Sequence, residues 1–137
     1  MYKHIVVAID GSENSMRALA QAADIAQASP DAKVDVVSVI AIDVYSDMVY
    51  DPIEAHGDSQ RELVDPAVRA LKEAGIDPEV VLMHGRPADE IVRYLDKVGA
   101  DLMVIGCRGL NALQEFAIGS VSHKVIKHAK CPVLVVK

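Results

Sequence analysis

The sequence is poor in cysteine, with two cysteines among 137 residues, and it contains no tryptophan. Cys107 and Cys131 form no CxxC pair and have no metal-ligand spacing, so we expect two reduced thiols, with Cys131 packed in the core. The histidines His4, His56 and His84 are scattered and predict no metal cluster. We therefore expect neither a disulfide framework nor a site of metal-ligating side chains.

Long hydrophobic runs and stretches of basic residues are also missing. No apolar segment reaches the ~18 residues that a membrane-spanning helix requires, and the N-terminal stretch becomes polar too early for a signal peptide. The chain has 14 basic against 20 acidic residues, a net charge of -6, and no run of lysine or arginine. We therefore expect a cytoplasmic protein without membrane insertion and without a nucleic-acid partner.

The chain does contain enough apolar sequence for a folded core. Hydrophobic residues make up 51% of it and charged residues 25%, with no low-complexity tract, which argues against disorder. A length of 137 residues is typical of one domain, so we expect a single domain over residues 1–137.

Short apolar runs alternate with segments of helical periodicity along the whole chain. Nearly continuous apolar strands, each followed by a helix, are typical of a parallel sheet covered on both faces. The pattern predicts an α/β fold, a three-layer doubly wound sheet of five parallel strands with helices on both faces. The expected strands are 3–9, 33–42, 78–85, 100–106 and 131–137, and the expected helices are 12–29, 59–75, 86–99 and 119–129.

Two features interrupt this regular alternation. Pro66 lies inside the helical pattern of 59–75, which predicts a kink or a late start of that helix. Residues 43–58 show no clear periodicity, and we expect them to form a long loop after the second strand.

The segment "GCRGLNALQEFAIGS", residues 106–120, contains the candidate ligand loop. Neither G-x-G-x-x-G nor G-x-x-x-x-G-K-[ST] occurs, but Gly106, Gly109, Gly119 and Ser120 follow the spacing G-x2-G-x9-G-S. Glycines let backbone N–H groups approach an anion, and a helix that begins at Gly119-Ser120 would point its positive end at a phosphate. The alternative is that these glycines only end a strand, make a turn and begin a helix.

Asp10 ends the first strand and could face the same ligand. If the first and fourth strands are neighbours, Asp10 and Gly106 end at one crevice, where a carboxylate suits a ribose hydroxyl or a metal on the phosphates. The alternative is that Asp10 or Ser12 caps the first helix.

With these motifs the sequence resembles the universal stress protein family over essentially its whole length. The glycine spacing matches the ATP-binding members, as do "VVAIDGS" near the start and "HAKCPVLVVK" at the end. The resemblance implies strand order 3-2-1-4-5 and ATP, with Mg²⁺ or Mn²⁺, at the carboxyl ends of strands 1, 2 and 4. The residues implied to bind the nucleotide are Ala8, Asp10, Val39, Gly106, Arg108, Gly109, Gly119, Ser120, Val121 and Ser122.

The resemblance also implies a homodimer through the last strand, residues 131–137, with a tetramer as a further assembly. The apolar sequence of this strand also favours a dimer, because an apolar strand at the edge of a sheet is otherwise left unpaired. The chain departs from the family at Cys107, where Ser or Thr is common, and at Glu115, a carboxylate that would repel phosphates.

Three functions are consistent with the sequence. The first is an ATP-binding regulatory module of the stress response. The second is a slow ATPase or phosphotransferase, for which His123 could approach a γ-phosphate, the alternative being that His123 is a solvated residue of its helix. The third is a dimeric scaffold with a vestigial nucleotide site, which Glu115 would favour. We assign no catalytic residue and expect weak ATP hydrolysis at most.

Overall fold

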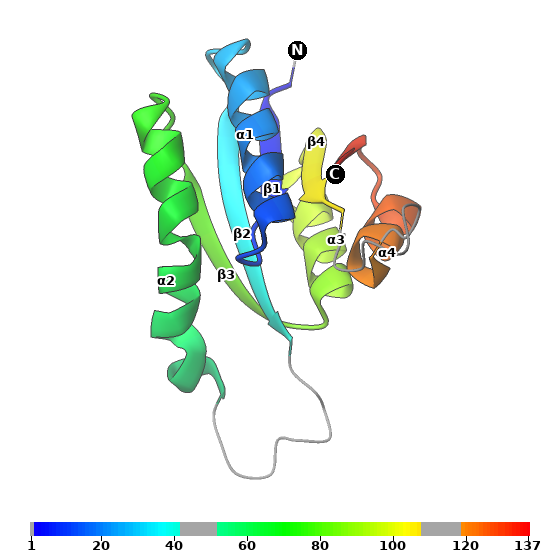
Figure 1. Cartoon of the computed structure of the whole chain (residues 1–137). Coiled ribbons are helices and arrows are strands. Elements are labelled where there is room, and N and C mark those ends of the chain that lie inside the picture. The colour runs from blue at the N-terminus through cyan, green and yellow to red at the C-terminus, as the bar shows by residue number, and fades with distance from the viewer. Residues whose placement is uncertain (1, 42–51, 108–118) are drawn as a thin grey trace.

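The computed structural model describes residues 2–41, 52–107 and 119–137, with no side-chain detail for 52–58. Its centre is one sheet of five parallel strands in the order β3-β2-β1-β4-β5 (Figure 1). The predicted fold class and strand order are both confirmed. The strands are β1 (His4–Ala8), β2 (Lys33–Ala41), β3 (Glu79–Gly85), β4 (Leu102–Gly106) and β5 (Val133–Val136).

Four helices cover the two faces of the sheet. The helices α1 (Glu13–Gln27) and α2 (Pro52–Glu73) pack on one face, and α3 (Pro87–Val98) and α4 (Ser120–His128) pack on the other. In the described part of the chain, no helix is both long enough and apolar enough to cross a bilayer.

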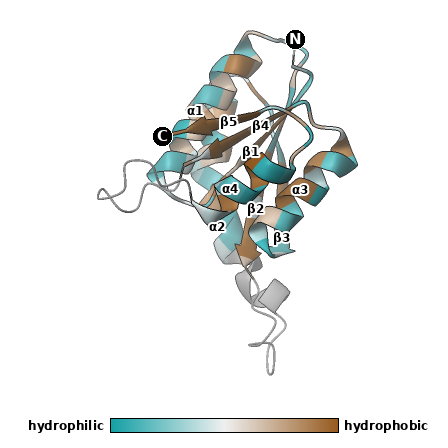
Figure 2. Ribbon diagram, turned by 90° about the vertical axis from the view of Figure 1, so that its right-hand side faces the viewer, coloured by the Kyte–Doolittle hydropathy of each residue, from teal (hydrophilic) through white to brown (hydrophobic). Residues whose placement is uncertain are grey.

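The apolar runs are buried because the central strands are covered on both sides. Along β1, Ile5 and Val7 pack with α1 and α2, whereas Val6 between them packs with α3 and α4. All three are fully buried. In Figure 2 the strands β4 and β5 are mostly brown, while the helices carry teal residues on their outer sides. A strand buried on both faces needs apolar residues at every position, as the sequence pattern indicated.

The winding of the sheet reverses beside β1. This strand pairs with β2 on one side, with Ala8 opposite Val37, and with β4 on the other, with Val7 opposite Val104. The connection through α1 and the connection through α3 leave the sheet on opposite faces, so a crevice opens above the carboxyl ends of β1 and β4.

The second helix corrects two sequence-based expectations. It begins at Pro52, so residues 52–58 of the expected loop 43–58 are helical, and a late start at Pro66 is wrong. Proline suits the first position of a helix, and Pro66 is tolerated inside because it lies on the exposed side, where water can reach the carbonyl that loses its partner. The remainder of the expected loop, residues 43–51, lies outside the described residues.

Candidate functional site

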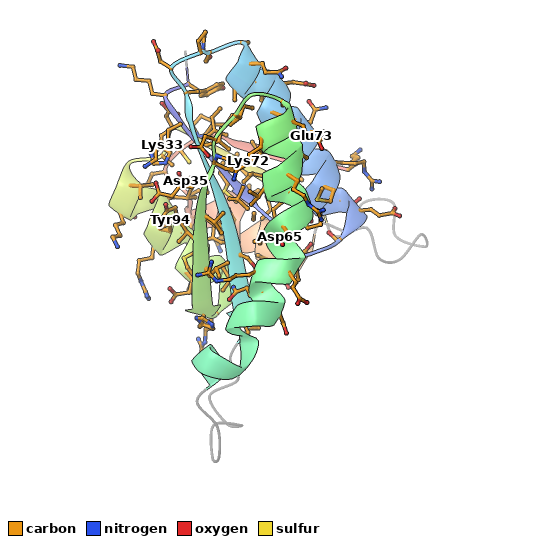
Figure 3. All side chains as sticks on the ribbon, turned by 90° about the vertical axis from the view of Figure 1, so that its left-hand side faces the viewer. Lys33, Asp35, Asp65, Lys72, Glu73 and Tyr94 are labelled. Carbon is orange, nitrogen blue, oxygen red and sulfur yellow. The ribbon has the colours of Figure 1, made fainter. Side chains whose placement is uncertain are left out.

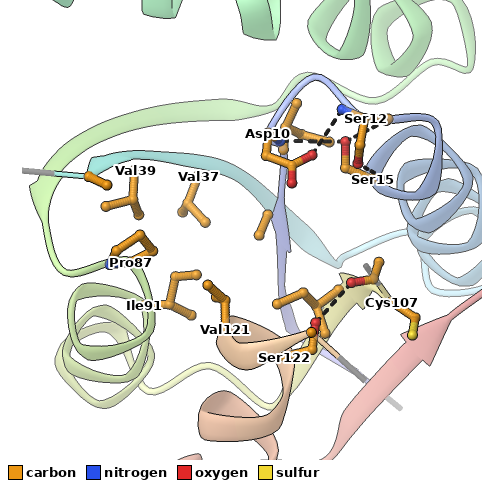
Figure 4. Close-up of a pocket in the computed structure, with 16 residues that line it drawn as sticks. Asp10, Ser12, Ser15, Val37, Val39, Pro87, Ile91, Cys107, Val121 and Ser122 are labelled. Carbon is orange, nitrogen blue, oxygen red and sulfur yellow. Dashed lines mark hydrogen bonds between the residues drawn. The ribbon is translucent and has the colours of Figure 1, made fainter. Parts of the chain in front are cut away.

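A pocket of about 300 Å³ lies at the carboxyl ends of β1, β2 and β4 (Figure 4). It brings together residues from five stretches that are far apart in the sequence, namely 8–15, 37–41, 87–91, 105–107 and 119–122. Seven of the ten expected site residues line it, namely Ala8, Asp10, Val39, Gly106, Gly119, Val121 and Ser122. Arg108 and Gly109 lie outside the described residues, as does Glu115.

The Asp10 carboxylate is held at the rim of the pocket by the turn that follows β1. Its Oδ1 accepts a hydrogen bond from the backbone N–H of Ser12 at 2.9 Å (Figure 4). Gly11 between them has φ 84°, a left-handed conformation that glycine adopts without steric cost. The turn therefore fixes the direction of the carboxylate before any ligand binds.

Ser12 caps the first helix, as one of the two sequence alternatives predicted. Its Oγ accepts the backbone N–H of Ser15 at 3.1 Å, and the Ser15 hydroxyl donates back to the Ser12 carbonyl at 2.8 Å. Capping is thus assigned to Ser12, and Asp10 precedes the cap. The carboxylate of Asp10 and the side chains of Ser12 and Ser15 therefore lie along one side of the pocket.

Gly106 has a packing role in addition to its place in the pocket. A β-carbon at this position would lie 2.6 Å from the carbonyl carbon of Asn14 and 2.9 Å from the backbone nitrogen of Ser15. Only glycine allows the end of β4 to approach the start of α1 so closely. Backbone packing alone is therefore enough to explain why residue 106 is glycine, without a role in ligand binding.

The fourth helix points its N-terminus at the pocket. Ser122 is buried, and its hydroxyl donates to the Gly106 carbonyl at 3.0 Å, which fixes the first turn of α4 against the end of β4. Gly119 is the N-cap and provides no side-chain cap, and the first turn contains no acidic residue. The N–H groups at this helix end favour an anion.

Ser120 is exposed and lies to the side of this pocket. It lines a neighbouring hollow, together with Arg86 and Lys124, that shares Pro87 and Val121 with the main pocket.

An apolar wall faces the polar one. Val37, Val39 and Ala41 from β2 lie opposite Pro87 and Ile91 from α3, as Figure 4 shows for the four labelled members of this group. Sequence reasoning assigned Val39 but missed the two α3 residues. Their signal was available, because a helix that follows a parallel strand begins at the carboxyl edge of the sheet. One side of the pocket is therefore apolar and is built from β2 and α3.

The charge of the pocket comes from Asp10, the one charged residue among its described lining residues. No group of three or more potential metal-ligating side chains occurs in residues 2–41, 52–107 and 119–137. A single carboxylate suits Mg²⁺ only when phosphate oxygens supply further ligands. His123 is exposed on α4 and does not line the pocket.

The fold and the pocket define a doubly wound α/β protein with a pocket at the switch point of its sheet. The chain belongs to the universal stress protein family, whose family model matches residues 1–137. It is 32% identical to universal stress protein YxiE of Bacillus subtilis, with 100% of each chain covered.

Two solved structures of similar proteins contain adenine nucleotides. One is a universal stress protein in complex with cAMP, with 31% identity, a TM-score of 0.75, and 99% of this chain and 97% of that chain covered. The other is the universal stress protein from Archaeoglobus fulgidus in complex with dAMP, with 30% identity, a TM-score of 0.76, and 99% and 98% covered.

Proposed function

We propose that this protein is an ATP-binding regulatory module of the stress response, which binds the nucleotide in the pocket at the carboxyl ends of β1, β2 and β4. The observation that carries the proposal is the pairing of an apolar slot with a polar end that contains a helix N-terminus. Adenine is flat and largely apolar, whereas phosphate is an anion, so the two ends of the pocket match the two ends of the ligand.

The adenine ring would lie between β2 and α3. Val39 and Ala8 lie on the pocket side of their strands, and Pro87 and Ile91 supply the opposite wall. The complexes of the two similar proteins with cAMP and dAMP support an adenine nucleotide as the ligand class.

The ribose and phosphates would lie toward α4. The Asp10 carboxylate can accept a hydrogen bond from a ribose hydroxyl, and Gly119, Val121 and Ser122 place the helix N-terminus beside the phosphates. Arg108, Gly109 and Ser120 complete the proposed contacts. Mg²⁺ or Mn²⁺ would be held by phosphate oxygens, and would offset the repulsion between the Asp10 carboxylate and the triphosphate.

The apolar edge strand supports the proposal of a homodimer. The four residues of β5 are all only partly buried, and the strand forms one edge of the sheet, with β4 as its neighbour. Pairing with the same strand of a second copy about a two-fold axis would cover this edge. A tetramer built from such dimers and a cytoplasmic location belong to the same proposal.

The test is isothermal titration calorimetry of nucleotide-stripped protein with ATP and Mg²⁺, followed by assay of the same sample for ADP and phosphate. We expect micromolar binding without release of phosphate. Steady release would instead support the ATPase or phosphotransferase, and absence of binding would support the scaffold with a vestigial site.

A matched variant locates the binding at the glycine loop. Gly109→Val places a branched side chain where the backbone is proposed to meet phosphate, so we expect loss of ATP binding with an unchanged circular dichroism spectrum. Equal affinity in the variant and the parent would refute the phosphate-cradle proposal.

A further inference from the structure

We propose that Asn14 is a positioning residue of the nucleotide site, which holds the backbone at Cys107, where the chain leaves β4. The residues proposed to contact the phosphates, Arg108 and Gly109, follow directly in the sequence. Nothing in the glycine spacing or in the family motif involves Asn14. The inference rests on the proposed function and concerns how the phosphate end of the site is held in place.

Asn14 contacts the end of β4 through both its side chain and its backbone. Its Nδ2 donates a hydrogen bond to the Cys107 carbonyl, across 93 positions of sequence. Its backbone lies so close to Gly106 that a β-carbon there would be 2.7 Å from the Asn14 carbonyl oxygen. The first turn of α1 therefore holds Gly106, the last residue of β4, and Cys107, which follows it, and both line the pocket.

Arg17 determines which way the Asn14 amide faces. Its guanidinium donates to Asn14 Oδ1, so the amide nitrogen is directed toward Cys107. The Nε of Arg17 donates in turn to the Lys137 carbonyl at 2.9 Å, which links α1 to the chain beyond β5. Arg17 also lies 3.8 Å from Glu13, an exposed ion pair that is expected to add little.

The peptide groups of Cys107 are held from two sides. The carbonyl accepts from Asn14, and the N–H donates to the Val136 carbonyl of β5 at 2.7 Å. These backbone groups are therefore engaged by α1 and β5, and their role in the pocket is to set the direction of the chain. A direction fixed in advance lowers the ordering cost when phosphates bind.

The adenine slot lies away from this link, since Val39, Pro87 and Ile91 come from β2 and α3. Loss of the Asn14 hydrogen bond would therefore weaken ligands that carry phosphates and leave adenosine binding unchanged. General damage to the fold would weaken both ligands alike. The ratio of ATP affinity to adenosine affinity separates the two cases.

The experiment compares ATP with Mg²⁺ and adenosine by titration calorimetry on the full chain. In Asn14→Ala we expect ATP affinity to fall about tenfold, the typical effect of one such hydrogen bond, and adenosine affinity to stay within about twofold. Asn14→Asp keeps the acceptor for Arg17 but removes the donor, and we expect at least the same loss. Arg17→Ala, at an exposed position, should give a smaller loss in the same direction.

Gln27→Ala is the matched control. Its amide also tethers α1 to a backbone carbonyl, that of Ala74 at 3.1 Å, but at the far end of the helix. We expect both affinities of Gln27→Ala to equal those of the parent.

Unchanged ATP affinity in Asn14→Ala and Arg17→Ala, with a parent that binds ATP, would overturn the inference and leave the proposed function intact. Equal losses for ATP and adenosine would overturn it as well. A parent that binds neither ligand would refute the proposed function and the inference together.

Discussion

The hydroxyl of Tyr94 donates a hydrogen bond to the carboxylate of Asp35 at 2.6 Å, which joins α3 to β2 (Figure 3). The same oxygen of Asp35 lies 2.6 Å from Nε2 of His4, the first residue of β1. Asp35 is fully buried, and Lys33 and Tyr94 lie beside it. This cluster lies toward the amino ends of the strands, at the opposite end of the sheet from the pocket, and we expect it to contribute to stability.

The Tyr94 contact predicts a change of stability at alkaline pH. Burial, and then the hydrogen bond to Asp35, raise the pKa of Tyr94 above its ordinary value of 10.0. The folded state therefore retains the phenolic proton to higher pH than the unfolded state, so this contribution is intact below pH 10 and is lost as the pH rises above 10. We expect the parent to lose free energy of unfolding over this range.

Tyr94→Phe removes the titrating group and provides the measurement. At pH 7 we expect the variant to be less stable by about 1.5–3 kcal/mol, the usual contribution of a hydrogen bond to a charged group. The free energy of unfolding is measured at each pH by urea unfolding followed by circular dichroism. Above pH 10 it should decrease less steeply with pH in the variant than in the parent. Parallel curves for the two proteins would contradict the assignment. The pKa of Lys33 is also raised, by its hydrogen bond to Glu79. Because Lys33 is present in both proteins, its titration contributes equally to the two curves.

Gly106→Ala tests the backbone contact between β4 and α1. The added β-carbon would lie 2.6 Å from Asn14, so backbone must shift, and overpacking of this kind costs about 1–3 kcal/mol. We expect a lower urea midpoint in the absence of nucleotide. Ser120→Ala, an exposed position at the start of α4, should change stability by less than about 0.5 kcal/mol. An unchanged midpoint for Gly106→Ala would mean that the close packing is not required.

Asp10→Ala tests the role of the pocket carboxylate. It removes the oxygens that would accept a ribose hydroxyl, so adenosine and ATP should both bind about tenfold more weakly, because each contains the ribose. Titration calorimetry of both ligands checks this expectation. A loss confined to ATP with Mg²⁺ would instead identify Asp10 as a metal ligand and contradict the ribose contact.

Val135→Lys tests the β5 interface. A lysine in the middle of the edge strand places unpaired charge where a second copy would pair, so we expect a shift from dimer to monomer in sedimentation velocity. Ala20→Lys adds the same charge at an exposed position of α1 and should leave the assembly unchanged. The same sedimentation profile for Val135→Lys and the parent would refute pairing through β5. Circular dichroism would show whether each variant is folded.

The fold could be predicted from the sequence because apolar runs and helical periodicity are local patterns along the chain. Continuous apolar runs such as 33–42 and 100–106 can be stable only as strands covered on both faces, and helical periodicity between them implies the crossovers. Residues 52–58 were mistaken for a loop because they lack an apolar periodicity, although Pro52 occupies a favourable first position of a helix.

The candidate site was predicted only in part. The glycine spacing and Asp10 could be found because the sequence motif places them at the ends of strands. Pro87 and Ile91 were missed although a helix that follows a parallel strand begins at this edge of the sheet. Asn14 could not be found, because nothing in α1 taken alone marks a residue that contacts the end of β4.

The sequence by itself therefore determined the parallel sheet, its helical layers and the carboxyl edge at which a ligand would lie. The tertiary structure alone decided that Gly106 must be glycine for Asn14 to approach, and that Asp35 pairs with His4 and Tyr94. The reason is physical. Periodicity and propensity act between neighbours along the chain, whereas close packing and buried hydrogen bonds depend on which distant segments the fold brings together.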